Sequence, residues 1–458
     1  MLEQNVLMHL KSPLSVNLEV TEKCNLSCSF CFNAAPLYSE SMAEGEKPFL
    51  LEKKEEPIQI QRKRRILSII DKLSESGVFE IRLFGGEFTV FKFWREIAEY
   101  IASKNMFISF VSNGYLFTEE DIDLFVRLGL RECNISVHGP EEIHDRVTNK
   151  PGSFKKAMQS IKFLQDRGIT VSVAYTPNMA NLGHVYEFVK KLKNVYNVQH
   201  YGINRLFQDE RYRNLTLQNY QNLLDVIDNC SKDFGVNIFL IDSFPRCAVK
   251  IKHWKHLAYC SQGVGFAQVD FNGNIKHCSA INKSLGNVLL DDMDTLWQTN
   301  LQAMRSLEHL PKSCRICPIF CGGGCTASRG VNHQFVPDEF IPWPDDETLV
   351  QSYSKAIYNL GRKMVFDLFH QPGGQNQKAT DLPEFPKLSK RYRVRMEDSD
   401  TYVAMFESSG IRILTPMAKD ILEMLDGKST ISEIHSKIQS LGHNCSESEI
   451  LEIVQDLM

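Results

Sequence analysis

The chain has 458 residues, of which 43% are hydrophobic and 24% charged, and its formal net charge is -4. This length can bury two or three domain cores, and the nearly balanced charge gives no electrostatic reason to expect nucleic acid or an anionic membrane as a partner. No run of about 18 apolar residues occurs and the first residues, MLEQNVLMHLKSP, lack the apolar core of a signal peptide, so neither a membrane span nor export is expected.

The first predicted element is a strand over residues 14–20, where apolar and polar residues alternate. It leads into the sequence CNLSCSFC, which carries Cys24, Cys28 and Cys31. Four thiolates usually saturate a four-iron cluster, so three from one loop would leave one iron for a non-protein ligand. Zinc or buried structural thiols remain alternatives, although zinc prefers separated pairs or a nearby histidine. Thirteen cysteines without an export signal favour a reducing compartment, and we expect the cytoplasm.

This loop resembles the three-cysteine signature of the radical S-adenosylmethionine (SAM) enzymes, with Phe30 in the aromatic place before the last cysteine. The resemblance implies a [4Fe-4S] cluster on Cys24, Cys28 and Cys31 whose open iron binds the amino and carboxylate groups of SAM. It also implies that one-electron reduction cleaves SAM to a 5'-deoxyadenosyl radical, which abstracts a substrate hydrogen.

Residues 34–65, rich in Glu and Lys, are predicted to be a solvated, mobile face or a lid over the cluster. Strand and helix patterns then alternate. Helices are expected at 66–73, from Trp94, after caps at Thr118 and Ser153, and at 181–192, and further strands at 78–84, 106–112, 134–138, 169–175 and 198–206. Such alternation predicts an α/β fold with a parallel sheet, where ligands sit at the carboxyl ends of the strands. Six units match the partial (β/α)6 TIM-like barrel of the radical SAM enzymes, over residues 1–245.

Polar and glycine residues follow several of these strands. Glycine lets backbone approach a ligand, and a carboxylate accepts from an ammonium group. By resemblance, the cofactor contacts are expected to include Gly85, Gly86, Glu87, Ser112, Asn113, Ser136, Arg146 and Asn181. A plain turn would also explain residues 112–114. His138 and His144 are candidates for catalysis or for structural, solvent-facing roles.

Cysteines return after residue 246. Cys260 precedes two short strand-like pieces joined by a turn at Asn272-Gly273, which end at Cys278, and SCRICPIFCGGGC adds four more. The four are Cys314, Cys317, Cys321 and Cys325. These thiols resemble the SPASM extension of peptide-modifying radical enzymes, which carries auxiliary [4Fe-4S] clusters, and we assign it residues 246–368. Two other thiols, Cys133 and Cys230, are expected to be buried in a strand and a helix.

By resemblance, Cys260, Cys278 and Cys325 would serve the first auxiliary cluster, with Cys247 a candidate fourth ligand, and Cys314, Cys317 and Cys321 the second. The chain departs from the family pattern in the short gap between Cys317 and Cys321 and in the lack of a cysteine between Cys325 and Cys445. The second cluster's fourth ligand is therefore open, with His333, Asp338 or a substrate thiol as candidates. A single auxiliary cluster, or zinc at the four-cysteine loop, is a further alternative.

A helix is expected at 349–368, and residues 369–390, rich in Pro, Gly and Gln, are predicted to be a linker. Residues 391–458 are predicted to be a small domain with a short sheet and three helices, the first starting at Thr415-Pro416. This tail resembles the PqqD-like winged-helix module, which binds the leader of a precursor peptide as an added strand. A DNA-binding winged helix or an oligomer contact is the alternative, and no basic recognition helix supports DNA.

Together these resemblances imply a radical SAM oxidoreductase that modifies a ribosomally synthesised precursor peptide (RiPP), for example by forming a thioether or carbon–carbon cross-link. They imply an external electron donor such as flavodoxin or ferredoxin. One alternative is a protein maturase of the anaerobic sulfatase-modifying type. Another is a non-enzymatic, metal-stabilised peptide-binding scaffold.

Overall fold

The structure is a computed structural model that describes residues 10–31, 56–206, 215–276, 278–281, 283–301, 310, 312–315, 317, 321–325, 327, 338–341, 382–388, 391–407 and 410–458. The chain divides into two compact units, one of Ser12–Phe366 and one of Asp367–Met458 together with Met1–Lys11. The predicted helix at 349–368, the candidate ligand His333, residues 34–55 and most of the linker lie outside the described residues. The domain limits expected at 245 and 368 stay a prediction.

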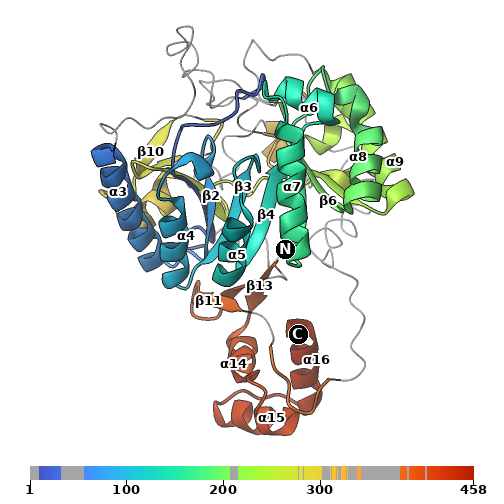
Figure 1. Cartoon of the computed structure of the whole chain (residues 1–458). Coiled ribbons are helices and arrows are strands. Elements are labelled where there is room, and N and C mark those ends of the chain that lie inside the picture. The colour runs from blue at the N-terminus through green and yellow to red at the C-terminus, as the bar shows by residue number, and fades with distance from the viewer. Residues whose placement is uncertain are drawn as a thin grey trace. The chain divides into compact units, whose positions relative to one another are not determined.

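The larger unit is built on one sheet of parallel strands, as the alternating pattern predicts, and the expected α/β fold class is confirmed. Its first seven strands lie side by side in chain order: β1 (Ser15–Glu19), β2 (Glu80–Phe84), β3 (Phe107–Ser112), β4 (Leu130–Ser136), β5 (Val171–Tyr175), β6 (His200–Ile203) and β7 (Asn237–Leu240). Figure 1 shows α4, α5 and α7 in front of this sheet. All these strands end at the same edge, so the loops that follow them converge there.

The helices between these strands are α3 (Glu56–Glu75), η1 (Phe88–Val90), α4 (Trp94–Ser103), α5 (Glu119–Leu128), α6 (Glu141–Val147), α7 (Ser153–Asp166), η2 (Leu182–His184), α8 (Val185–Tyr196) and α9 (Leu217–Phe234). The cap expected at Thr118 is confirmed as a capping box with Asp121. The cap expected at Ser153 is wrong, because Gly152 is the N-cap of α7 and Ser153 is its first residue. The carboxylate of Asp145, in α6, accepts from the backbone nitrogens of Gly152 and Phe154 instead.

Two stretches of this unit differ from the sequence prediction. Residues 56–65, expected to belong to a mobile face or lid, form the first half of α3. The unpredicted helix α9 and strand β7 follow β6 and add a seventh parallel strand to the expected six. Their signals were present, because Thr216 forms a capping box with Asn219 and Gly235 ends the helix in the left-handed conformation.

The cysteine-rich region extends the same sheet on its other edge. The predicted hairpin is confirmed as β8 (Phe266–Asp270) and β9 (Asn274–Lys276), with Gly273 in its turn at φ 88°. Strand β8 pairs in parallel with β1, next to the first cysteine loop. The remaining elements are η3 (Arg246–Ala248), η4 (Ile251–His256), β10 (Ser284–Asn287), α10 (Met293–Thr295), the π-helix η5 (Leu296–Asn300) and α12 (Lys312–Arg315).

A continuous apolar core fills the space between sheet and helices. Phe88, Trp94, Phe110 and Phe125 pack ring against ring, and all four are buried. Phe88 follows β2, so the loop after this strand is anchored by an aromatic side chain. Cys133 in β4 and Cys230 in α9 are buried, as predicted.

The smaller unit has its own sheet and its own core. An antiparallel sheet of β11 (Tyr392–Met396), β12 (Tyr402–Phe406) and β13 (Gly410–Leu414) is followed by α14 (Pro416–Met424), α15 (Ile431–Ser440) and α16 (Glu447–Leu457). The expected start at Thr415-Pro416 is confirmed, and Thr430 and Ser446 cap the next two helices with capping boxes. Strands β11 and β13 are the sheet edges.

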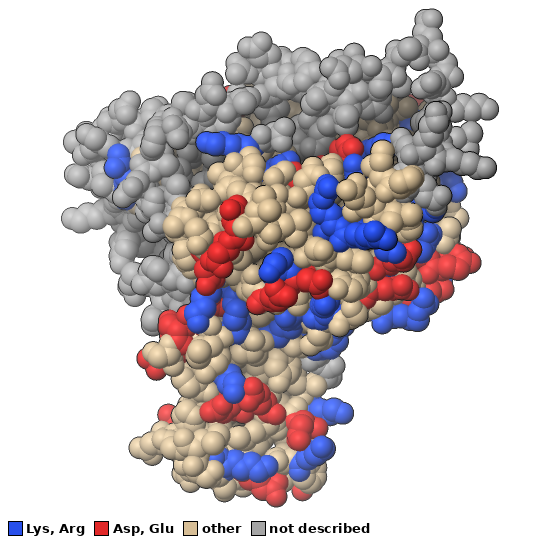
Figure 2. All heavy atoms as spheres, turned by 90° about the vertical axis from the view of Figure 1, so that its left-hand side faces the viewer, with Lys and Arg blue, Asp and Glu red and all other residues tan. Residues whose placement is uncertain are grey.

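Charged side chains of both signs are interspersed over the face shown in Figure 2, in line with the balanced composition. Among the described residues of the larger unit, Arg62 pairs with Glu22 at 2.7 Å and Lys104 with Asp71 at 2.5 Å. Within the described ranges, no helix is both long and apolar enough to span a bilayer.

Candidate functional site

The loop that carries Cys24, Cys28 and Cys31 leaves the carboxyl end of β1 and is held there by the glycines that follow β2. Gly86 N donates to Thr21 O at 2.8 Å and Glu87 N donates to Lys23 O at 2.8 Å. A Cβ at Gly86 would stand 2.4 Å from Lys23 O and 2.5 Å from Glu22 O, and one at Gly85 would stand 2.5 Å from Thr21 O. Both glycines are therefore required by the close approach of two backbone segments.

The end of β3 contacts the same loop through Asn113. Its amide Nδ2 donates to Asn25 Oδ1 at 2.8 Å and lies 3.8 Å from Cys24 Sγ. Asn113 Oδ1 accepts from Tyr115 N at 2.9 Å, which fixes the orientation of the amide. Asn113 thus connects the third strand to the first cysteine.

The Glu87 carboxylate is buried beneath this contact. It accepts from Thr89 N at 3.2 Å, Thr89 Oγ1 at 2.8 Å, Ser112 Oγ at 3.0 Å and Asn113 N at 2.7 Å. Burial raises the pKa of Glu87, and these hydrogen bonds only partly offset the effect. Glu87 therefore fixes the ends of β2 and β3 relative to each other, whatever else it binds.

The far side of the cysteine loop is tied to the end of α6. Ser29 N donates to Val147 O at 2.9 Å and Ser27 N donates to Thr148 O at 3.3 Å. Arg146, one residue before this contact, has an exposed side chain. Ser136 is half-buried at the end of β4. Ser136 thus closes the fourth strand, as the sequence predicts, whereas Arg146 lies in α6, and their contact with a cofactor stays a prediction.

Phe30 packs edge to face on His138, with ring centroids 4.7 Å apart. His138 Nδ1 accepts from Thr176 N at 3.2 Å, and its carbonyl accepts from Asn181 Nδ2 at 3.1 Å. The His144 ring stacks on His138 at 5.8 Å and accepts the His138 backbone N–H at Nδ1, 3.0 Å away. Burial lowers the pKa of both histidines, to about 4 for His144, so both are neutral at pH 7. Asn181 is buried and holds His138, the residue on which Phe30 of the cysteine loop packs.

The donor chemistry of the loop fits an iron–sulfur cluster with one open iron. Burial, and next the Glu87 carboxylate, raise the pKa of the Cys24 thiol to about 12, so Cys24 becomes a ligand when a cation replaces its proton. Asn25 Nδ2 is buried without a hydrogen-bond partner among the described residues and is a spare donor beside the cluster position. No three His, Cys, Asp or Glu side chains of the described ranges already stand ready to hold one metal ion, so this fit is one of ligand type.

The later cysteines fall into two groups in space. Of the ionisable groups around Cys260 and Cys278, Cys325 acts most strongly on both thiols. A second set comprises Cys247, Cys314, Cys317 and Cys321, because the ionisable groups that act on Cys247 are the other three thiols. All thirteen cysteines lie in the described ranges and none forms a disulfide.

Parts of this chain are similar to a known protein family and to known proteins. The model of the Radical SAM superfamily matches residues 18–192. Sporulation killing factor maturation protein SkfB of Bacillus subtilis (strain 168) is 32% identical over 182 residues, which cover 40% of this chain and 40% of SkfB. Antilisterial bacteriocin subtilosin biosynthesis protein AlbA of the same strain is 24% identical over 361 residues, covering 74% of this chain and 72% of AlbA. The match to SkfB thus spans less than half of the length of SkfB, whereas the match to AlbA spans 72% of the length of AlbA.

Among solved structures, Streptococcus suis SuiB bound to S-adenosylmethionine is similar with a TM-score of 0.54 at 14% identity, over 74% of this chain and 80% of SuiB. At that identity the likeness shows the fold. It agrees with the parallel sheet.

Proposed function

Because residues 18–192 of this chain form a radical SAM domain, we propose that the whole chain is a maturase that modifies a ribosomally synthesised precursor peptide by hydrogen abstraction. The single observation that carries the proposal is the placement of Cys24, Cys28 and Cys31. They stand on one loop at the carboxyl end of β1, in contact with the ends of β2, β3 and α6. The names of SkfB and AlbA, maturation and biosynthesis proteins of peptide products, support the peptide substrate.

In this proposal the three thiolates hold a [4Fe-4S] cluster. Such a cluster, once reduced, would supply the single electron whose transfer cleaves SAM into methionine and a 5'-deoxyadenosyl radical. The chain's own residues position the cofactor: Phe30, with His138 behind it, offers an aromatic edge. Gly85 and Gly86 would hold the cysteine loop in place through the backbone of residues 21–23, and Glu87 would support the cofactor from below by fixing Asn113.

Further cofactor contacts come from the surrounding strand ends. Asn113 and Asn25 present amides beside Cys24. Arg146, Ser136 and Ser112 complete the polar rim, and Asn181 supports it from behind through His138. One or two auxiliary [4Fe-4S] clusters would be held by the later cysteines. Flavodoxin or ferredoxin would supply electrons, in the cytoplasm.

The smaller unit is proposed to bind the precursor's leader. Strands β11 and β13 are the edges of the three-stranded sheet, and an extended peptide can join such an edge as a further strand. The unit's separate core and its three capped helices support an independent peptide-binding role.

The test is the formation of 5'-deoxyadenosine from SAM by anaerobically reconstituted, reduced protein. We expect wild type and Cys230→Ala to cleave SAM, and the triple variant Cys24→Ala/Cys28→Ala/Cys31→Ala to be inactive. Cys230 is the matched control because it is buried in α9, away from the loop. Absence of SAM cleavage by the wild-type protein would contradict the proposal. If the triple variant is then also unfolded, the result would favour the metal-stabilised scaffold, which has no chemistry to lose.

Deletion of residues 391–458 separates peptide maturation from sulfatase-type modification. A maturase that reads a leader through this unit should keep SAM cleavage but lose precursor binding and modification. A sulfatase-modifying enzyme has no need of a leader-binding unit, so unchanged substrate modification after the deletion would favour that alternative.

A further inference from the structure

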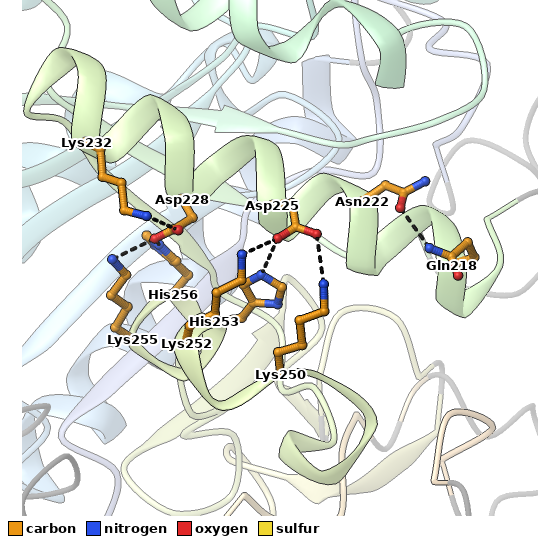
Figure 3. A network of polar contacts seen from close by, with 10 residues as sticks. All are labelled: Gln218, Asn222, Asp225, Asp228, Lys232, Lys250, Lys252, His253, Lys255 and His256. Carbon is orange, nitrogen blue, oxygen red and sulfur yellow. Dashed lines mark hydrogen bonds and ion pairs between the residues drawn. The ribbon is translucent and has the colours of Figure 1, made fainter.

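The segment that carries Cys247 is fixed to the outside of the barrel. Arg246 O accepts from Trp254 Nε1 at 3.0 Å, and Ala248 O accepts from Gln221 Nε2 at 2.9 Å, so the residues on both sides of Cys247 are held. Figure 3 shows how the following helix η4 and its N-cap residue are attached to α9: Asp225 and Asp228 of α9 form ion pairs with their basic side chains. The pairs are Asp225 with Lys250, Lys252 and His253, and Asp228 with Lys255 and His256.

The four-cysteine loop is brought to this fixed segment from the other side. Ser243 Oγ donates to Cys321 O at 2.7 Å. A Cβ at Gly322 would stand 3.4 Å from the Tyr259 ring. Gly322, like the two glycines after it, has a positive φ, so the chain turns sharply after Cys321. Cys321 thus lies against Ser243, in the segment that leads to Cys247, whereas Cys325, beyond the turn, lies against Asp338.

Cys325 is held in the group of Cys260 and Cys278 by a buried ion pair. Its backbone nitrogen donates to Asp338 Oδ2 at 2.9 Å. The same carboxylate oxygen accepts from Arg205 Nη1 at 2.7 Å, and both side chains are buried. Asp338, a candidate fourth ligand from the sequence, is therefore engaged with Arg205 and with the backbone of Cys325.

A second, independent observation points to a ligand at the Cys247 side. Arg246 is only 6% exposed, and its Nη2 donates to Leu257 O at 3.2 Å. Its Nη1 is buried with no hydrogen-bond partner in the described part of the chain. A buried guanidinium with an unused donor is costly unless an acceptor or negative charge meets it. An oxidised four-iron cluster with four thiolates carries a net negative charge and sulfur acceptors, and would meet this need.

We propose that Cys247 is the fourth thiolate of the second auxiliary cluster, with Cys314, Cys317 and Cys321, and that Arg246 Nη1 donates to that cluster. This assignment takes Cys247 away from the group of Cys260, Cys278 and Cys325, to which sequence order had assigned it. The inference rests on the proposed function only for the identity of the group as a four-iron cluster. The choice of the four thiols rests on their placement.

Double variants test the assignment, with iron and sulfide content and the electron paramagnetic resonance (EPR) spectrum of the reduced protein as readouts. The background is full-length, anaerobically reconstituted Cys24→Ala/Cys28→Ala/Cys31→Ala protein, expected to hold about eight irons in two auxiliary clusters. Cys247→Ala should remove about four irons and one EPR signal, and adding Cys321→Ala should remove no more. Adding Cys278→Ala to Cys247→Ala should instead remove both clusters.

The opposite pattern would overturn the inference: Cys247→Ala with Cys321→Ala losing both clusters, and with Cys278→Ala losing one. Cys230→Ala is the control and should keep the iron content of the background. Far-UV circular dichroism of each variant separates ligand loss from unfolding. Zinc could be found in place of iron at these four thiols and be lost in Cys247→Ala. This result would support the four-thiol assignment but contradict the second iron–sulfur cluster of the proposed function.

Arg246 is tested through the reduction potential of the same cluster. Replacing the donor, as in Arg246→Leu, should make the potential more negative without changing iron content, because a positive hydrogen-bond donor stabilises the reduced, more negative cluster. Arg246→Lys, which keeps the charge, should shift the potential less. An unchanged potential in Arg246→Leu would contradict the contact.

Discussion

Replacing Gly86 by alanine should dislodge the cysteine loop, because there is no room for one methyl group between β2's end and the segment before Cys24. The added Cβ would meet Lys23 O at 2.4 Å, Glu22 O at 2.5 Å and the carbonyl carbon of Lys23 at 2.7 Å, all of them backbone atoms. To reach an ordinary contact distance the Lys23 carbonyl would have to move by about 1 Å. Overpacking of this kind costs about 1–3 kcal/mol of folding free energy.

That displacement also threatens two hydrogen bonds, from Gly86 N to Thr21 O and from Glu87 N to Lys23 O, both 2.8 Å long. Each is worth about 1 kcal/mol net, so the total loss should lie near the upper end of the range. The loop moves with these carbonyls. We therefore expect a second effect, a lower iron content at Cys24, Cys28 and Cys31 after reconstitution.

Urea unfolding followed by tryptophan fluorescence is a suitable assay, because all four tryptophans precede residue 367 and therefore report on the larger unit. Gly183→Ala is the matched control, since a Cβ there meets nothing within 4 Å and the residue has no positive φ. It should change stability by less than about 0.5 kcal/mol. Equal urea midpoints and equal iron content for Gly86→Ala and Gly183→Ala would refute the reasoning.

Three further variants test the support of the site. Burial lowers the pKa of His144 to about 4, so as the pH falls below about 6.5 the unfolded state takes up a proton that the folded state does not. The folded state therefore loses up to about 3 kcal/mol of stability between pH 6.5 and pH 4. His144→Asn should make the urea midpoint less dependent on pH, and an unchanged slope would contradict this. Asp145→Ala removes the acceptor for Gly152 N and Phe154 N and should lower barrel stability by about 1–2 kcal/mol, with Asp145→Asn in between; a larger loss in the asparagine variant would be inconsistent with capping. Glu87→Gln should cost about 1–3 kcal/mol at pH 7, because an amide nitrogen then faces donors; wild-type stability in the same urea assay would argue against that network.

Local signals in the sequence predicted most of the barrel. Alternation in residues 14–20 and its repetition fixed the parallel strands β1–β6, and the Asn272-Gly273 turn predicted the β8–β9 hairpin. The side-chain cap at Thr118 was predictable because it acts within one turn of its own helix.

Contacts between distant segments were not predictable in this way. The cap of α7 comes from Asp145, eight residues before Ser153, so the expected Ser153 cap was wrong. The parallel pairing of β8 with β1 joins segments about 250 residues apart, and no local pattern encodes such a pairing.

The site shows the same division. The spacing of Cys24, Cys28 and Cys31 within one loop identified the candidate cluster, and Gly85-Gly86 stood out because two consecutive glycines end a strand. The sequence suggested that these glycines admit a ligand, whereas in the structure they admit the backbone of residues 21–23. The neighbours of Cys247 depend on how two distant loops meet, which chain order alone cannot give.

The most direct measurement of the central claim is the iron and sulfide content of anaerobically reconstituted protein, wild type against Cys24→Ala/Cys28→Ala/Cys31→Ala. The account predicts about twelve irons in the wild type and about eight in the variant, for one catalytic and two auxiliary four-iron clusters. Equal iron content in the two proteins would contradict it, because the three thiols at the end of β1 would then hold no cluster.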